Sequence, residues 1–192
     1  LYEVVLPGND RTAFIFAHGL VPAHFTWLTA TSSMFIHENL LHIGSNLWSL
    51  WIFGDNVEDQ LGHGRYLIFY LLTGYLAGLA EVWASPGSTV PLIGASGAIA
   101  GVMGAYFVMF PYSKILVLIP IIFFFNVIEV PAIIFLGFWL LLQLLGGVGR
   151  LAQPSATGGI AFWAHLGGFV IGVLLVWVFR RPERRRVEWW GA

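Results

Sequence analysis

The chain has no cysteine and few charged side chains. Of its 192 residues, 10% are Asp, Glu, Lys or Arg, 58% are hydrophobic, and the formal net charge is −1. Without cysteine, neither a disulfide framework nor a thiol nucleophile is available, and the redox compartment stays open. A nearly neutral chain gives no reason to expect nucleic-acid binding. Because a soluble domain carries about 25% charged residues, this composition predicts an integral membrane protein.

The chain also lacks an initiating methionine and a signal-peptide pattern at its start. Its first residues, LYEVVL, look like the outer end of an earlier membrane span. We therefore expect six spans in the parent protein, with the first largely missing from this chain. The expected division is residues 1–34 as the end of that span plus an external interfacial loop, residues 35–181 as a membrane bundle, and residues 182–192 as a basic cytoplasmic tail.

Long hydrophobic stretches dominate the rest of the chain. A membrane-spanning helix needs about 20 mostly apolar residues. Four stretches reach this length or nearly do: Tyr66–Trp83, Ile93–Phe110, Val130–Leu145 and Ile160–Phe179. A fifth stretch, Leu40–Phe53, is shorter and continues as a polar helix through Gly62. The sequence therefore predicts an all-α fold, a polytopic bundle of membrane helices.

Two other segments are apolar or aromatic without suiting a span. Between Lys114 and Glu129 the chain is apolar but is interrupted by Pro120, which predicts a re-entrant or interfacial loop. Residues Arg11 to Thr31 mix aromatic side chains with histidine and proline, which favours an interfacial loop at the level of the lipid headgroups.

Basic residues fall mainly on one side of the predicted spans. If the C-terminus is cytoplasmic, seven of the nine Lys and Arg lie inside, all except Arg11 and Arg150. This asymmetry agrees with the positive-inside rule. We expect a multi-pass protein of a bacterial or archaeal plasma membrane with a cytoplasmic C-terminus. The tail RRPERRRVEWWGA should then bind anionic lipid of the bilayer.

The stretch HENLLHIGSN, from His37 to Asn46, looks at first like the zinc-protease motif H-E-x-x-H. That motif needs two histidines four residues apart on one helical face, but His37 and His42 are five apart. At about 100° per residue they point roughly 140° away from each other, so a regular helix cannot offer both to one metal. His42 and Asn46 are four apart and share a face. They form a pair of hydrogen-bond donors, and we expect neither a metal nor a cofactor.

GASG, residues 94–97, opens a predicted span and surrounds Ser96 with residues that have almost no side chain. A serine in a membrane helix is usually structural. The last span carries His165, however, and an ionisable residue inside a membrane is by default a functional hypothesis. Small residues line one face of each of these two helices: Gly97, Gly101, Gly104 and Ala105 on one, Gly168 and Gly172 on the other. Such faces let two helices approach closely, which would bring a serine next to a base.

Four motifs in order, HENLLHIGSN, FGDNVEDQLGHGR, GASGAIAG and AHLGGFVIG, resemble those of the rhomboid intramembrane serine proteases. The resemblance extends from about Phe35 to Phe179. It implies a rhomboid-type bundle, with Ser96 as the nucleophile and His165 as its base. The implied activity is hydrolysis of peptide bonds in or next to the membrane helices of transmembrane protein substrates.

The resemblance also implies an oxyanion hole. Its donors would be the side chains of His42 and Asn46 and the backbone N–H of Ser96. His37 would hold the loop before the helix, and Gly94 and Gly97 are further candidates for supporting roles. The turn residues Glu58 and Arg65 match a family motif that braces two spans, whereas the remaining histidines have no expected catalytic part: His18, His24 and His63.

One position departs from the family pattern. Some members carry a tyrosine one turn after the nucleophile, packed on the catalytic imidazole, and this chain has Ala100 there. No Asp or Glu on the spans is an obvious third member of a triad, so we expect a Ser–His dyad, and the group that orients His165 stays open. Glu81 lies near the end of its span.

Three other functions compete with this one. A non-catalytic rhomboid-like scaffold that binds membrane helices would typically lack the Ser or the His, and both are present. A zinc intramembrane protease would need the H-E-x-x-H spacing. A transporter would show paired broken helices in matched halves, and the sequence has no such symmetry.

Overall fold

The computed structural model describes residues 6–121, 124–152 and 160–181. The expected remnant of a first span falls almost wholly in residues 1–5, and the basic tail falls in residues 182–192. Both expectations therefore lie outside the described residues.

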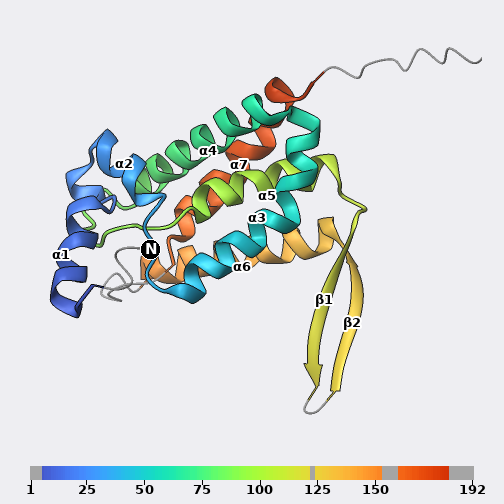
Figure 1. Ribbon diagram of the computed structural model, residues 1–192, viewed down its shortest axis with the longest axis horizontal. Coiled ribbons are helices and arrows are strands. Elements are labelled where there is room, and N and C mark those ends of the chain that lie inside the picture. Colours follow the sequence, from blue (N-terminus) through green and yellow to red (C-terminus); the bar gives the residue numbers. More distant parts are fainter. Residues whose placement is uncertain (1–5, 122–123, 153–159, 182–192) are drawn as a thin grey trace, which may run out of the picture.

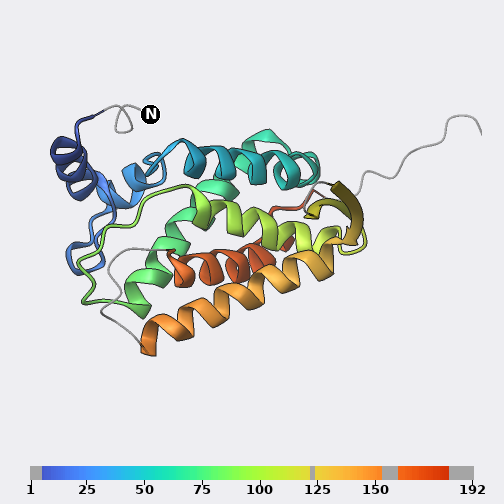
Figure 2. The same cartoon turned by 90° about the horizontal axis from the view of Figure 1, so that it is seen from below.

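Helices make up most of the described chain (Figure 1). In chain order they are α1 (Gly8–His18), the short 3-10 helix η2 (Pro22–His24), α2 (Trp27–Ser33), α3 (Leu40–Leu61), α4 (His63–Ala84), α5 (Ser96–Met109), α6 (Ala132–Ala152) and α7 (Phe162–Phe179). Helices α3 to α7 form the bundle, and α5 contacts each of the other four. Figure 2 shows α5 and α7 lying between α3 on one side and α6 on the other.

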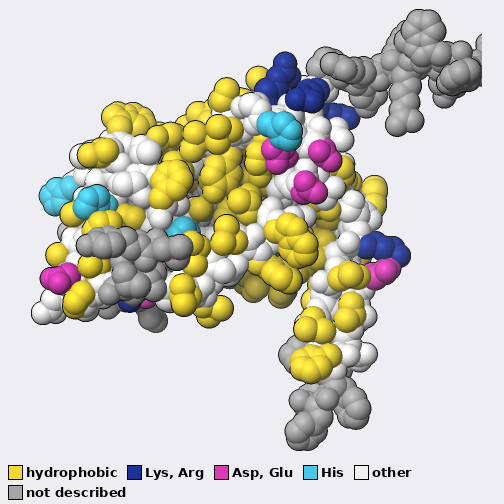
Figure 3. Space-filling model, in the orientation of Figure 1, with side chains coloured by type: hydrophobic (Ala, Val, Ile, Leu, Met, Phe, Trp, Pro, Cys, Tyr) yellow, Lys and Arg dark blue, Asp and Glu magenta, His cyan; other side chains and the backbone are white. Residues whose placement is uncertain are grey.

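The bundle has the surface of a membrane protein. By length and composition, α4, α7 and the Ala132–Gly149 part of α6 can each cross a membrane. Hydrophobic side chains cover much of the face seen in Figure 3, while Lys and Arg gather at the end where α4 begins and α7 ends. The prediction of a helical membrane bundle is confirmed.

Helix α5 is the buried centre of this bundle. All nine residues from Ala98 to Tyr106 are buried, so the helix is enclosed on every side. Glycines make this possible, because a Cβ on Gly168 or Gly172 of α7 would collide with a backbone carbonyl of α5. The backbones of α5 and α7 therefore touch directly, as the small-residue faces predicted.

Helix α5 begins at Ser96, three residues later than the predicted span. The preceding chain is extended, since Leu92 and Leu20 exchange backbone hydrogen bonds of 2.8 and 3.0 Å. Gly94 then adopts φ +109°, a conformation that residues with a side chain rarely take up. This kink turns the chain into the helix, so that Ser96 sits at the helix start inside the molecule.

The segment Lys114–Glu129 is more regular than the predicted re-entrant or interfacial loop. It forms an antiparallel hairpin of β1 (Lys114–Ile121) and β2 (Phe124–Pro131), which projects from the bundle in Figure 1. Its many Ile, Val and Phe residues favour strands. In a two-stranded sheet each strand has an outer edge, where Pro120 can sit without breaking the ladder. Lys114 and Glu129 form an ion pair at the base.

The segment from Arg11 to Thr31 is also more regular than predicted. Instead of a loop it contains most of α1, the turn η2 and part of α2, which lie together at one end of the bundle (Figures 1 and 2). Phe16, Trp27 and Leu28 on these helices are exposed. The aromatic residues that suggested an interfacial position are therefore carried on short helices, none of them long enough to be a span.

Candidate active site

Ser96 is the first residue of α5 and faces a cavity. The first N–H groups of a helix have no acceptor within the helix, and the helix dipole places partial positive charge there. Ala95, at the N-cap, makes no side-chain capping bond. The start of α5 thus combines a hydroxyl with backbone donors suited to a developing negative charge.

His165, in the first turn of α7, lies beside Ser96. Its Nε2 is 2.8 Å from Ser96 Oγ, which is hydrogen-bonding distance. The two residues are 69 positions apart in the chain, and the contact depends on the close packing of α5 and α7. The structure therefore brings the predicted nucleophile and the predicted base together.

The other side of the His165 ring meets helix α6. Its Nδ1 is 2.8 Å from Gln143 Oε1, and the Trp139 ring packs 5.8 Å from the imidazole at an interplanar angle of 35°. Neither α6 residue was among the predicted site residues. A signal existed, because Gln143 is the one strongly polar residue in the apolar run LLLQLL, and polar residues inside membrane helices are usually functional.

His42 and Asn46 face the same cavity from α3, one helical turn apart. The backbone N–H of Glu38 donates to His42 Nδ1 at 3.3 Å, so the proton of the neutral imidazole sits on Nε2. Asn46 is buried, and its Nδ2 has no hydrogen-bond partner in the described structure. Both side chains thus present a donor toward the site.

The predicted supporting residues take different places. A Cβ on Gly94 would lie 2.7 Å from His42 Nε2, so this glycine leaves room beside the donors as well as making the turn. His37 is buried behind His42, with its ring edge-on to that imidazole at 5.1 Å. Gly97 faces α4 instead, where a Cβ would lie 2.8 Å from Ala77 Cβ, so its role is in helix packing.

Two cavities meet at these residues. One of about 430 Å³ lies toward the loops before α5 and α7 and includes Glu38, His42 and Gln143 in its wall. The other, of about 370 Å³, extends between α3 and α6 to the base of β1 and is lined mainly by apolar side chains. Ser45, Asn46, Ser96, Trp139 and His165 line both. The serine–histidine pair therefore stands where a more polar space joins an apolar one.

The buried side chain of Glu81 supports the start of α7. Glu81, near the end of α4, is 1% exposed, and its Oε2 accepts a hydrogen bond of 3.0 Å from the backbone N–H of Ala164. The first N–H groups of a helix have no acceptor within the helix, so this bond satisfies one of them. Glu81 thus holds the backbone of Ala164, the residue before His165.

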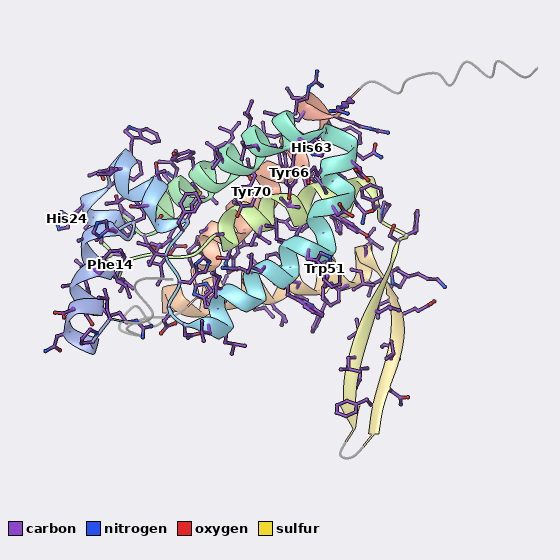
Figure 4. All side chains as sticks on the ribbon, in the orientation of Figure 1. Phe14, His24, Trp51, His63, Tyr66 and Tyr70 are labelled. Atoms are coloured by element: carbon purple, nitrogen blue, oxygen red, sulfur yellow. The ribbon has the colours of Figure 1, made fainter. Side chains whose placement is uncertain are left out.

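The remaining histidines lie on the surface. His18, His24 and His63 are exposed, and Figure 4 shows His24 and His63 at opposite ends of the molecule. His63 contacts Glu58 at 2.5 Å, and Arg65 donates to Phe179 O at 3.4 Å. These contacts tie the turn between α3 and α4 to the end of α7. Within the described ranges, no three His, Asp or Glu residues lie close enough together to hold a metal ion.

Comparison with known proteins identifies relatives. Residues 24–182 match the family model of the rhomboid domain. The chain is 31% identical over 166 residues to rhomboid protein 1, mitochondrial, of Saccharomyces cerevisiae, covering 83% of this chain and 44% of that protein. It is 31% identical over 170 residues to rhomboid-like protein 11, chloroplastic, of Arabidopsis thaliana, covering 83% and 54%. It is 33% identical over 102 residues to rhomboid protease GluP of Bacillus subtilis, covering 51% and 20%.

The relatives bear on the cellular location and on the extent of the match. Several are named as mitochondrial or chloroplastic, so they do not support the expected bacterial or archaeal plasma membrane. The chain spans about half or less of the length of these three relatives. Integration in a membrane is confirmed by the domain match together with the apolar helices. Because that match covers most of the chain, this chain belongs to the rhomboid family.

Proposed function

We propose that the chain is an intramembrane serine protease in which Ser96 is the nucleophile and His165 the general base. One observation carries this proposal: Ser96 Oγ lies 2.8 Å from His165 Nε2 at the start of a buried helix, facing a cavity. A serine is activated when a base within hydrogen-bonding reach can take its proton. A non-catalytic scaffold would have no need for this pairing.

The reaction follows from the positions of these atoms. As Ser96 Oγ attacks the substrate carbonyl carbon, its proton passes to His165 Nε2 and the carbonyl oxygen becomes an oxyanion. That oxyanion accepts hydrogen bonds from His42 Nε2–H, Asn46 Nδ2–H and the backbone N–H of Ser96. His165 then gives the proton to the leaving amine, and water hydrolyses the acyl-enzyme by the same steps.

The two cavities support a membrane-protein substrate. A helical backbone hides its carbonyl groups in hydrogen bonds, so the substrate must become extended before Ser96 can attack it. The apolar cavity between α3 and α6 suits the side chains of such a segment, and the more polar cavity suits the entry of water. We propose transmembrane proteins as the substrates, cleaved within or beside their membrane helices.

The test uses the full chain in lipid vesicles with a single-span substrate and a fluorophosphonate probe. We expect cleavage of the substrate and labelling of Ser96, and both should disappear in Ser96→Ala. Ser113→Ala, beyond the far end of α5, serves as the matched control and should cleave and label normally. Labelling that persists in Ser96→Ala, or binding of the substrate without any cleavage, would contradict the proposal.

A further inference from the structure

Gln143 is a buried amide on an otherwise apolar helix face. It is 8% exposed, whereas its neighbours Leu142 and Leu144 are 46% and 45% exposed. Burying an amide inside a membrane protein costs free energy unless its polar atoms are hydrogen-bonded. The hydrogen-bond partners of the amide oxygen and the amide nitrogen should therefore explain why Gln143 is buried here.

Both ends of the Gln143 amide are used, and they fix its orientation. The Nε2 group donates to the backbone carbonyl of Trp139 at 3.4 Å, one turn back on α6. The oxygen Oε1 is thereby turned toward His165 Nδ1, 2.8 Å away. Because an amide oxygen only accepts hydrogen bonds, Nδ1 must carry a proton. The lone pair of a neutral His165 is then on Nε2, 2.8 Å from Ser96 Oγ.

This arrangement matters because a free neutral imidazole can carry its proton on either nitrogen. Only the form with the proton on Nδ1 can take a proton from Ser96. In soluble serine proteases an aspartate selects this form, and replacing it by the amide costs about 10⁴ in kcat because the amide holds the wrong tautomer. Here the donor end of the amide is bound by the carbonyl of Trp139, so the acceptor end faces the imidazole.

Trp139 and Gln143 together hold the ring. The indole packs against the imidazole 5.8 Å away, and the amide binds its Nδ1 edge. Both side chains come from α6, while Ala100 of α5 offers only a methyl group. A neutral acceptor also avoids placing a second charge in an apolar interior, which a carboxylate would do.

We propose that Gln143 is the positioning residue of the hydrolytic site, which holds His165 in the tautomer and orientation that accept the Ser96 proton. The site thus works as a Ser–His–Gln relay of hydrogen bonds in place of a dyad. This inference rests on the proposed protease function, because it assigns Gln143 a role in that reaction.

The test compares Gln143→Met and Gln143→Glu with the wild-type chain in vesicles, using Leu142→Met as the control on the outward face. We expect Gln143→Met to lower kcat by about 10- to 100-fold, a fraction of what a whole general base contributes, with KM and Tm little changed. Gln143→Glu should recover much of the lost kcat, because its carboxyl group keeps an oxygen that accepts from Nδ1–H in either protonation state. Leu142→Met should behave as wild type.

The outcomes separate this inference from the function on which it rests. If wild type cleaves and Gln143→Met cleaves equally fast, the positioning role is wrong and the protease function stands. The same holds if Gln143→Glu is no faster than Gln143→Met. If wild type neither cleaves nor labels with fluorophosphonate, the protease function fails and this inference fails with it.

Discussion

At the scale of single residues, the buried amide nitrogen of Asn46 is informative about the candidate site. Inside a protein a polar group without a hydrogen bond carries a cost of about 1–3 kcal/mol. Asn46 Nδ2 is such an atom in the described structure, and it lies on the wall of the cavity beside Ser96. An unpaired donor at this position is explained if it hydrogen-bonds to the oxyanion that the proposed reaction would form beside it.

We predict that Asn46→Ala lowers kcat by about 100- to 1,000-fold, the cost of losing an oxyanion donor from a soluble protease. KM should change little, because the donor acts mainly in the transition state. Its unpartnered nitrogen makes no folding contact to lose, so Tm should stay close to that of wild type. Kinetics and melting are to be measured on the same samples.

Asn56→Ala provides the comparison, since it makes the same replacement at an exposed position of α3. It should leave both kcat and Tm unchanged. If Asn46→Ala melts at a lower temperature but turns over normally, Asn46 is a packing residue and contributes nothing to an oxyanion hole.

At the scale of helices, the site depends on how closely α5 and α7 approach. Gly168 of α7 lies against the carbonyl of Gly97, one residue after Ser96, and His165 is only three residues from Gly168. If the two backbones move apart here, the distance between Ser96 and His165 increases as well. Gly168 therefore affects both the packing of α5 against α7 and the Ser96–His165 distance.

We predict that Gly168→Ala destabilises the fold by about 1–3 kcal/mol, as overpacking of a tight core does. The added methyl group would collide with the Gly97 carbonyl and push Ser96 away from His165. Fluorophosphonate labelling of the folded fraction should therefore slow, which a thermal unfolding assay run in parallel will distinguish from loss of folded protein.

Gly137→Ala is the matched control on α6, because nothing lies within 4 Å of the position that its Cβ would occupy. Alanine also favours helix over glycine by up to about 1 kcal/mol. This variant should be as stable as wild type or more so, and should label at the normal rate. Equal behaviour of the two variants would show that the α5–α7 contact does not limit the site.

At the scale of the whole molecule, the described structure is an apolar bundle with few buried polar side chains. The long apolar helices leave large hydrophobic side chains exposed on the outside, among them Leu141, Val170 and Trp177, which lipid can cover. Inside, Asn46 and Gln143 line a cavity together with Ser96 and His165. The chemistry proposed here uses side chains and backbone donors only.

We predict that metal chelators leave cleavage unchanged. His37 lies behind His42 with the two rings edge to face, and the Nδ1 of His42 accepts a backbone hydrogen bond, so the pair is not arranged as metal ligands. The assay measures cleavage by the full chain in vesicles after exhaustive treatment with chelator. Activity that disappears and returns on addition of zinc would restore the metalloprotease alternative.

The sequence alone determined the membrane bundle, the family and the residues nominated for the site. The bundle follows from apolar stretches of sufficient length, and the close approach of two helices follows from their small-residue faces. The family and most of the site residues follow from the resemblance of four ordered motifs to those of rhomboid proteases. The i, i+4 spacing of His42 and Asn46 is likewise a property of any regular helix.

Only the tertiary structure decided what surrounds His165. Gln143 is 22 residues away in the chain and Glu81 is 83 residues from Ala164, so no local pattern relates them. The hairpin was missed for a similar reason, because an apolar run with a proline suits several structures until its strands find each other as partners. Contacts between distant residues depend on how helices pack, and packing is a property of the whole bundle.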